Sequence, residues 1–147
     1  MAPVPVHLHW RYIALVFAGG ALGTTARYLL SSAVPAVAGW PVPTFGINIA
    51  GAFLLGWLLE SLALRGPDTG RRRSIRLFAG TGVLGGFTTY SALAVDADGL
   101  FVAQHIASAI AYAIATILVG ALASLAGIAL GARLGRLRAK RGSDPVS

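Results

Sequence analysis

Four long apolar stretches, separated by short polar segments, are the feature that most constrains how this chain can fold. They cover approximately residues 12–34, 44–64, 75–95 and 100–130. Each is close to the roughly 20 residues that a helix needs to cross a bilayer. Only 12% of the 147 residues are charged, whereas soluble domains carry about 25%. Since lipid cannot satisfy free backbone groups, we expect an all-α integral membrane protein with four transmembrane helices, forming a single membrane domain over residues 1–147.

The Lys and Arg residues are distributed on one side only. If the N-terminus is inside, eleven of the twelve lie inside: Arg11, Arg65, Arg71, Arg72, Arg73, Arg76, Arg133, Arg136, Arg138, Lys140 and Arg141. The positive-inside rule then predicts a multi-pass protein of the inner (plasma) membrane with both termini cytoplasmic. The basic tail, residues 131–147, is expected to fray at its end.

Composition also excludes several function classes. The chain has no cysteine, so disulfides, thiolate metal sites and cysteine nucleophiles are absent. The net charge of +7 raises the question of nucleic-acid binding, but the cations occupy loops and ends, as membrane orientation requires. We therefore expect no nucleic-acid partner.

Arg27 lies inside the first stretch, in the segment GGALGTTARY. A charged residue in a membrane helix is costly, and two interpretations remain open for this one. Its side chain either extends to the outer interface or serves as a cation that attracts an anion or ties helices together. The glycines at 19, 20 and 23 are expected to allow close packing of a neighbouring helix.

The second stretch opens with PTFGINIAG, in which Asn48 follows Thr44 by one helical turn on the same face. A membrane-embedded asparagine often joins two helices by hydrogen bonds, and here it is equally compatible with a pore lining. Gly51 and Gly56 indicate that a neighbouring backbone approaches closely.

The third stretch contains GTGVLGGFTTYSAL, which is a poor helix sequence. Each glycine costs about 1 kcal/mol of helix stability relative to alanine, and the β-branched Thr88 and Thr89 follow Gly85 and Gly86. We expect a break here, which survives at membrane depth only when it is buried in protein or lines a cavity. Its carbonyls can bind a cation, and its amides and hydroxyls, including Ser91, can bind an anion. A packing kink without a ligand is the alternative.

A short turn is expected around Asp96, Asp98 and Gly99, before the fourth stretch begins near Leu100. Asp96 is either a carboxylate of the pathway or a residue that ends a helix. In the fourth stretch, Ser108, Tyr112 and Thr116 recur every four residues and predict a polar track along one helix face. Such hydroxyls can instead bond to their own helix.

Together, GGALGTTARY, PTFGINIAG and GGFTTYSAL resemble the Fluc/CrcB family of fluoride channels, in motifs, order and length. The resemblance implies an antiparallel dimer of four-helix subunits with two narrow pores. It implies that the carbonyls of Gly85 and Thr88 hold a central structural Na⁺ shared by both subunits. It also implies a fluoride pathway, for which the matching or neighbouring polar positions are Arg27, Thr44, Asn48, Ser91, Asp96, Tyr112 and Thr116.

One departure from the family concerns two pore phenylalanines, in a pattern like TTFSTF. Tyr90 and Leu93 occupy these positions here. A phenyl edge carries partial positive charge that can face an anion, whereas leucine has no such edge and tyrosine adds a hydroxyl. Another is Gly120, which stands where a third hydroxyl of the fourth stretch is expected.

The resemblance implies a channel that exports cytoplasmic fluoride down its gradient and performs no chemistry on a substrate. An antiparallel homodimer needs a chain that inserts both ways, and the one-sided charge opposes this. A heterodimer with a homologous partner of opposite bias is therefore favoured over a homodimer. The alternatives are a small proton-coupled multidrug exporter and a non-transporting membrane assembly protein.

Overall fold

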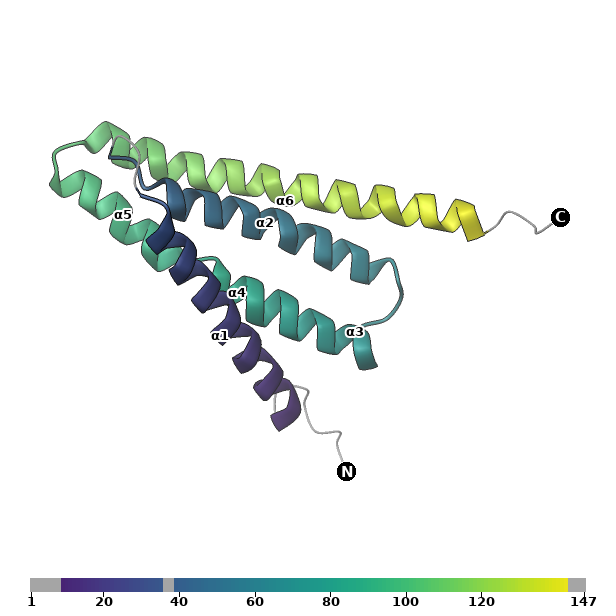
Figure 1. The fold of residues 1–147 in the computed structure, drawn as a ribbon. Helices are drawn as coiled ribbons and strands as arrows, with labels where there is room; N and C mark the ends of the chain where they lie inside the picture. The colour runs from purple at the N-terminus through teal and green to yellow at the C-terminus, as the bar shows by residue number, and fades with distance from the viewer. Residues whose placement is uncertain (1–8, 36–38, 143–147) are drawn as a thin grey trace, which may run out of the picture.

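The computed structural model describes residues 9–35 and 39–142, and the secondary-structure elements in these ranges are all helices. They are α1 (Trp10–Ala33), α2 (Val42–Ala63), α3 (Gly70–Ile75), η2 (Arg76–Leu84), α4 (Gly85–Phe87), α5 (Tyr90–Val102) and α6 (Ile106–Gly142). Long α6 runs beside α2, while α1 crosses η2 and α4 (Figure 1). The short α5 packs against the start of α6.

Three helices in the described residues are long and apolar enough to cross a membrane: α1, α2 and the Ile106–Lys140 part of α6. The third apolar stretch does not form one such helix, because it is divided at Thr88 and Thr89. The expectation of an all-helical membrane protein is thus confirmed at this level. The fourth membrane crossing stays a prediction.

Few large side chains are buried. The buried apolar set among the described residues is Ile47, Leu62, Leu84, Leu93, Leu100, Ala109 and Tyr112. Many other large apolar side chains are exposed, on α1 and α6 above all. Large exposed apolar faces mark membrane or protein contacts, so this surface fits helices surrounded by lipid or by another chain.

Glycines allow α1 to approach the first half of the third stretch. A methyl group placed on Gly82 would lie 2.9 Å from the Cα of Gly19, and one on Gly23 would collide with the carbonyl oxygen of Val83. The expected close packing is therefore confirmed for Gly19 and Gly23. A methyl on Gly20 would meet open space, but a methyl on Gly86 would lie 2.5 Å from the Gly20 carbonyl oxygen, so the backbone of Gly20 also takes part in the close packing.

The turn expected at Asp96, Asp98 and Gly99 is wrong. These residues lie within α5, which continues to Val102, and α6 begins at Ile106 rather than near Leu100. The chain turns instead at Gln104, whose φ of 63° is left-handed. The Gln104 amide bonds the Phe101 carbonyl and the His105 amide bonds the Leu100 carbonyl, both at 2.9–3.0 Å. These two bonds satisfy the last carbonyls of α5, as a Schellman end does.

The last helix also runs further than the expected end at residue 130, since α6 continues to Gly142. Leu, Arg, Ala and Lys dominate residues 131–140, and all four are strong helix formers. The fraying is expected at the end of this tail, and residues 143–147 lie outside the described part of the chain.

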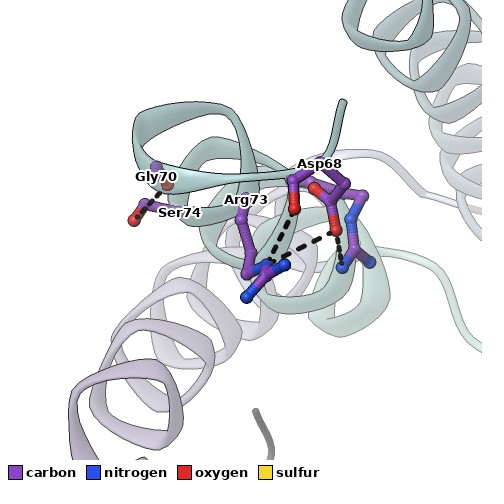
Figure 2. Close-up of polar contacts among 5 residues, drawn as sticks. Asp68, Gly70, Arg73 and Ser74 are labelled. Atoms are coloured by element: carbon purple, nitrogen blue, oxygen red, sulfur yellow. Dashed lines mark hydrogen bonds and ion pairs between the residues drawn. The ribbon is translucent and has the colours of Figure 1, made fainter. Parts of the chain in front are cut away.

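An ion-pair cluster fixes the loop between α2 and α3 (Figure 2). Arg76 donates to the Asp68 carboxylate at 2.8 Å, and Arg73 Nε donates to the Asp68 carbonyl at 2.9 Å. The hydrogen bond from Arg76 holds the pKa of Asp68 below its usual value of 3.8. This loop thus neutralises part of its own positive charge.

Candidate functional site

The helix break lies at two threonines in extended conformation. Thr88 has φ −76° and ψ 154°, and Thr89 has φ −151° and ψ 119°. The Thr88 hydroxyl donates to the Leu84 carbonyl at 2.9 Å, which closes the preceding helix. The Thr89 hydroxyl accepts a hydrogen bond from the Ala92 amide at 3.1 Å and so caps the N-terminus of α5. The break expected from GGFTTYSAL is therefore present and has its own local hydrogen bonds.

Asn48 of α2 holds the break from the side. Its Nδ2 donates to the Thr89 carbonyl at 3.0 Å, and its Oδ1 accepts the Thr89 amide at 2.8 Å. One side chain therefore satisfies both backbone groups of a residue that has left the helix. The interhelical role left open for Asn48 is seen directly in this geometry.

Gly51, one turn further along α2, leaves room for the Thr88 methyl group, which a methyl at Gly51 would strike. Gly56 contacts the Ser124 backbone on α6 in the same way. The close approaches expected at these two glycines are confirmed. Together with Asn48, they place the break against the centre of α2.

Arg27 reaches the same break from α1. Its Nε donates to the Gly86 carbonyl at 3.2 Å, and the Thr24 hydroxyl donates to the same oxygen at 3.4 Å. Of the two interpretations for Arg27, this geometry is that of a cation tying two helices together. The guanidinium has further N–H groups beyond the one used here, so it can also hold an anion.

The carbonyls of Gly85 and Thr88 are the open groups of the break. Their usual helical donors would be the amides of Thr89 and Ala92, four residues on. Those amides donate instead to Asn48 and to the Thr89 hydroxyl. Within residues 9–35 and 39–142, no hydrogen bond from another element reaches either carbonyl. Two such oxygens are of the hard type that binds Na⁺.

A second polar group forms where α2, α5 and α6 meet. The Tyr112 hydroxyl donates to Asp96 Oδ2 at 3.3 Å, and the Thr44 side chain interacts with it from α2. Tyr112 is fully buried, and Thr44 and Thr116 are also buried. The Thr116 hydroxyl donates to the Tyr112 carbonyl at 2.7 Å, so it bonds to its own helix. Asp96 thus belongs to this cluster and does not end a helix.

The two positions of the family's phenylalanines have opposite environments. Tyr90 is 80% exposed, whereas Leu93 is buried in a cluster with Leu100, Ala109 and Tyr112. Ser91 is exposed, and its hydroxyl pairs with that of Thr89 at 3.1 Å. The expected aromatic position at Tyr90 therefore faces away from its own subunit, and Leu93 faces into it.

Sequence reasoning did not single out Thr89 or Trp40 as site residues. Thr89 carries the backbone groups that Asn48 binds, and the available signal was a threonine three residues before Ala92, the spacing of a helix cap. The Trp40 ring meets the Tyr112 ring edge-on, with centroids 6.3 Å apart. No spacing in the sequence indicates that contact.

Comparison with known proteins gives consistent results. The model of the CrcB-like (camphor resistance, CrcB) family matches residues 14–128. A Leifsonia xyli subsp. xyli protein named fluoride-specific ion channel FluC 2 is 71% identical over 131 residues, which is 89% of this chain and 90% of the relative. Proteins named fluoride-specific ion channel FluC 1 are 49% identical in Cutibacterium acnes over 111 residues and 44% identical in Mycobacterium bovis over 115 residues. These matches cover 75% and 78% of this chain, and 78% and 85% of the relatives.

The family is one of ion channels and not of enzymes, judged by the names of these relatives. The match extends over all three motifs from which the resemblance was read, since residues 14–128 contain each of them. The chain therefore belongs to the CrcB family.

Proposed function

We propose that this chain is a subunit of a fluoride-specific channel that releases cytoplasmic fluoride down its gradient and so reduces fluoride toxicity. One observation carries the proposal: a helix break held by Asn48, in a chain 71% identical to a protein named for that activity. Its location is the plasma membrane, crossed four times with both termini cytoplasmic. The charge distribution supports this orientation.

Fluoride holds its water tightly, so a selective pore must replace that water with fixed donors. Only one N–H of Asn48 is used by Thr89, and its second remains available for an anion. The hydroxyls of Tyr112 and Thr116 continue the pathway after turning from Asp96 and from their own helix. Arg27 draws the anion toward the break.

The two remaining pathway positions lie at the ends of this polar route. Thr44 stands beside the Tyr112 hydroxyl, and Ser91 is exposed next to Thr89. Both carry a hydroxyl that can donate a hydrogen bond to an anion, and neither carries a carboxylate. Asp96 takes part in this route as the acceptor of the Tyr112 hydroxyl, and conduction through the amide and hydroxyl donors needs no proton coupling.

The structural Na⁺ belongs to the same proposal. The Gly85 and Thr88 carbonyls fit it because they are hard oxygen donors whose helical partners bond elsewhere. Gly85 is exposed in the single chain, which leaves room for the same two oxygens of a second subunit. A bound Na⁺ would supply positive charge that holds the two breaks together.

The partner we propose is a homologous chain in an antiparallel dimer. Two opposed copies would place the eleven one-sided cations on opposite faces of the membrane, against the positive-inside rule. A partner with the opposite charge bias removes this conflict. The relatives' names, FluC 1 and FluC 2, fit two similar chains acting together.

In such a heterodimer the two pores are unequal. Tyr90, which is 80% exposed, would meet the partner at one pore, and Leu93 would stand beside a partner phenylalanine at the other. A partner with the usual phenylalanines then supplies the aromatic edges that this chain lacks.

Growth of bacteria that lack their own fluoride exporter tests this assembly. This chain expressed alone should give little fluoride resistance, and coexpression with a homologue of opposite charge bias should restore growth in fluoride. A chain with Asn48→Ala in the coexpressed pair serves as the inactive control. Full resistance from the single chain would contradict the heterodimer, while leaving the channel function in place.

The multidrug exporter is not favoured. That mechanism requires a membrane-buried carboxylate in the first span, and α1 contains none. The assembly protein is not favoured either, because an inert kink does not need the specific two-bond clamp of Asn48. Fluoride flux distinguishes both from a channel.

A further inference from the structure

A pocket of about 590 Å³ lies between the last turns of α2 and the basic part of α6. It is remote from the helix break and takes no part in the pathway described above. Its lining consists of Trp57, Glu60, Ser61, Leu64, Arg65, Gly131, Ala132, Leu134, Gly135, Arg136, Arg138 and Ala139. A volume in this range is typical of small-molecule sites.

Glycines on α6 bring this helix close to the end of α2 at the edge of the pocket. A methyl group on Gly131 would lie 3.0 Å from Glu60 Cβ, and one on Gly135 would lie 2.6 Å from Leu64 Cδ1. The two helices are therefore in contact up to this level. α2 ends at Ala63 while α6 continues to Gly142, so the residues of α6 beyond Gly135 extend past the end of α2.

The charge of the pocket is positive. Arg65, Arg136 and Arg138 line it together with one carboxylate, Glu60, which leaves two positive charges in excess. The ion pairs found in the described part of the chain all belong to Asp68, so these three guanidinium groups are not neutralised by an ion pair. Arg136 and Arg138 are two residues apart on a helix, and so they flank the small residues from different sides.

Apolar walls accompany these cations. Trp57, Leu64 and Leu134 line the same pocket, and each is exposed at 37%, 54% and 38% respectively. The site lies where α6 changes from apolar residues to the basic segment that starts at Arg133. We expect this to be the depth of lipid headgroups, since the apolar part of α6 before it is long enough to cross the hydrocarbon.

We propose that this pocket binds an anionic phospholipid, with Arg65, Arg136 and Arg138 around its phosphate and Trp57, Leu64 and Leu134 against the start of its acyl chains. Arginine forks match phosphate oxygens in pairs, and tryptophan favours the membrane interface. A free phosphate ion would interact with the three arginines but not with the apolar side chains. The combination of both surfaces therefore favours a lipid.

Trp57 supplies a local probe. In a Trp10→Phe/Trp40→Phe chain, Trp57 is the one remaining tryptophan. This chain is placed in phosphatidylcholine vesicles containing brominated phosphatidylglycerol or brominated phosphatidylcholine, and quenching of Trp57 by bromine gives the relative affinity. Each cation near an anionic headgroup contributes about 1 kcal/mol, a factor of about five. Phosphatidylglycerol should therefore bind at least about five-fold more tightly than phosphatidylcholine.

Arg136→Gln/Arg138→Gln should reduce this preference to less than about two-fold, because the charge of the remaining Arg65 is then offset by Glu60. Arg71→Gln/Arg133→Gln removes the same charge from positions outside the pocket and should leave the preference intact. Arg136→Lys/Arg138→Lys should also retain most of it, which shows that the protein is folded. An equal loss in the Arg71/Arg133 variant, or no preference in the parent chain, would overturn the proposal. So would removal of the preference by millimolar inorganic phosphate, since that marks a site for the free ion.

Discussion

At the scale of single residues, the structure depends most on Asn48. Its side chain replaces the two backbone hydrogen bonds that Thr89 gives up when the helix breaks. Since a membrane interior contains no water, solvent cannot take over the two hydrogen bonds that Asn48 makes to Thr89. Its Nδ2 has a second N–H that no hydrogen bond within the described residues uses, and the proposed pathway takes an anion donor from it.

Asn48→Ala should lower the free energy of unfolding by about 1–3 kcal/mol, because it leaves a partly buried amide and carbonyl of Thr89 without partners. The melting temperature of the purified protein measures this, and fluoride flux should be lost as well. Ser32→Ala removes an exposed hydroxyl that bonds its own helix at 2.8 Å, and should change neither quantity. Asn48→Ala with unchanged stability and flux would show that the clamp is unnecessary.

The sequence predicts these residues unevenly. Asn48 and the break were both recognisable, because an amide in an apolar helix and a Gly-Gly-x-Thr-Thr run each contradict their surroundings. The hydrogen bonds between Asn48 and the break were not recognisable, since they depend on how α2 crosses it. The sequence likewise does not predict that Tyr112 bonds Asp96 or that Thr116 bonds its own helix. Residue spacing indicates which helix face a side chain lies on, but not its rotamer and therefore not its hydrogen-bond partner.

At the scale of helices, close contact with α1 shapes the third stretch. Gly19 and Gly23 allow α1 to touch η2 backbone to backbone, and η2 is a π-helical segment whose amides reach five residues back, as Gly85 does to Gly80. Such segments are rare in proteins, and where they occur they often lie at functional sites. The break and the widened helix before it therefore form one irregular unit supported from α1 and α2.

Gly23→Ala should destabilise the protein by about 1–3 kcal/mol, because its methyl would overlap the Val83 carbonyl and force α1 away. Gly20→Ala is the matched control three residues earlier, where a methyl meets open space. It should be neutral or stabilising by up to about 1 kcal/mol through helix propensity. Melting temperatures of both variants decide the matter, and equal destabilisation would refute the packing argument.

The loop between α2 and α3 gives a pH prediction. The Arg76 hydrogen bond lowers the pKa of Asp68 in the folded state, so its stabilisation is complete above the ordinary value of 3.8 and is lost as pH falls further. Asp68→Asn should lower the melting temperature slightly at neutral pH, since exposed ion pairs contribute about 0–1 kcal/mol. This difference should be constant near neutrality and vanish in acid below 3.8. Asp98→Asn, which changes an exposed carboxylate of α5 outside this loop, is the control, and a similar effect there would show that the difference does not come from the Asp68 ion pair.

At the scale of helices, one sequence pattern also leads to a wrong prediction. Asp96, Asp98 and Gly99 have the composition of a turn, yet they lie within α5. Leu93 and Leu100 bury one face of α5 against α6, and this packing outweighs the weak helix propensity of Gly99. The real turn uses Gln104 in a left-handed conformation, which glycine or asparagine normally occupies.

At the scale of the whole molecule, the described residues leave apolar surfaces and polar backbone groups uncovered. Large apolar side chains cover the outside of α1 and α6, Tyr90 is 80% exposed, and the carbonyls of Gly85 and Thr88 have lost their helical donors. With four crossings, eleven of the twelve cations would lie on one side, which predicts a preferred direction of insertion. These properties are those expected of one half of an antiparallel pair, and they underlie the heterodimer proposed here.

Fluoride efflux from liposomes tests the central claim most directly. This chain is purified together with a homologue of opposite charge bias, reconstituted into liposomes loaded with potassium fluoride, and followed with a fluoride electrode after valinomycin opens a path for K⁺. We predict rapid fluoride efflux that needs no proton gradient, no chloride efflux under the same conditions, and loss of fluoride efflux with Asn48→Ala. Absence of fluoride efflux from the pair, or equal passage of chloride, would contradict the proposed function.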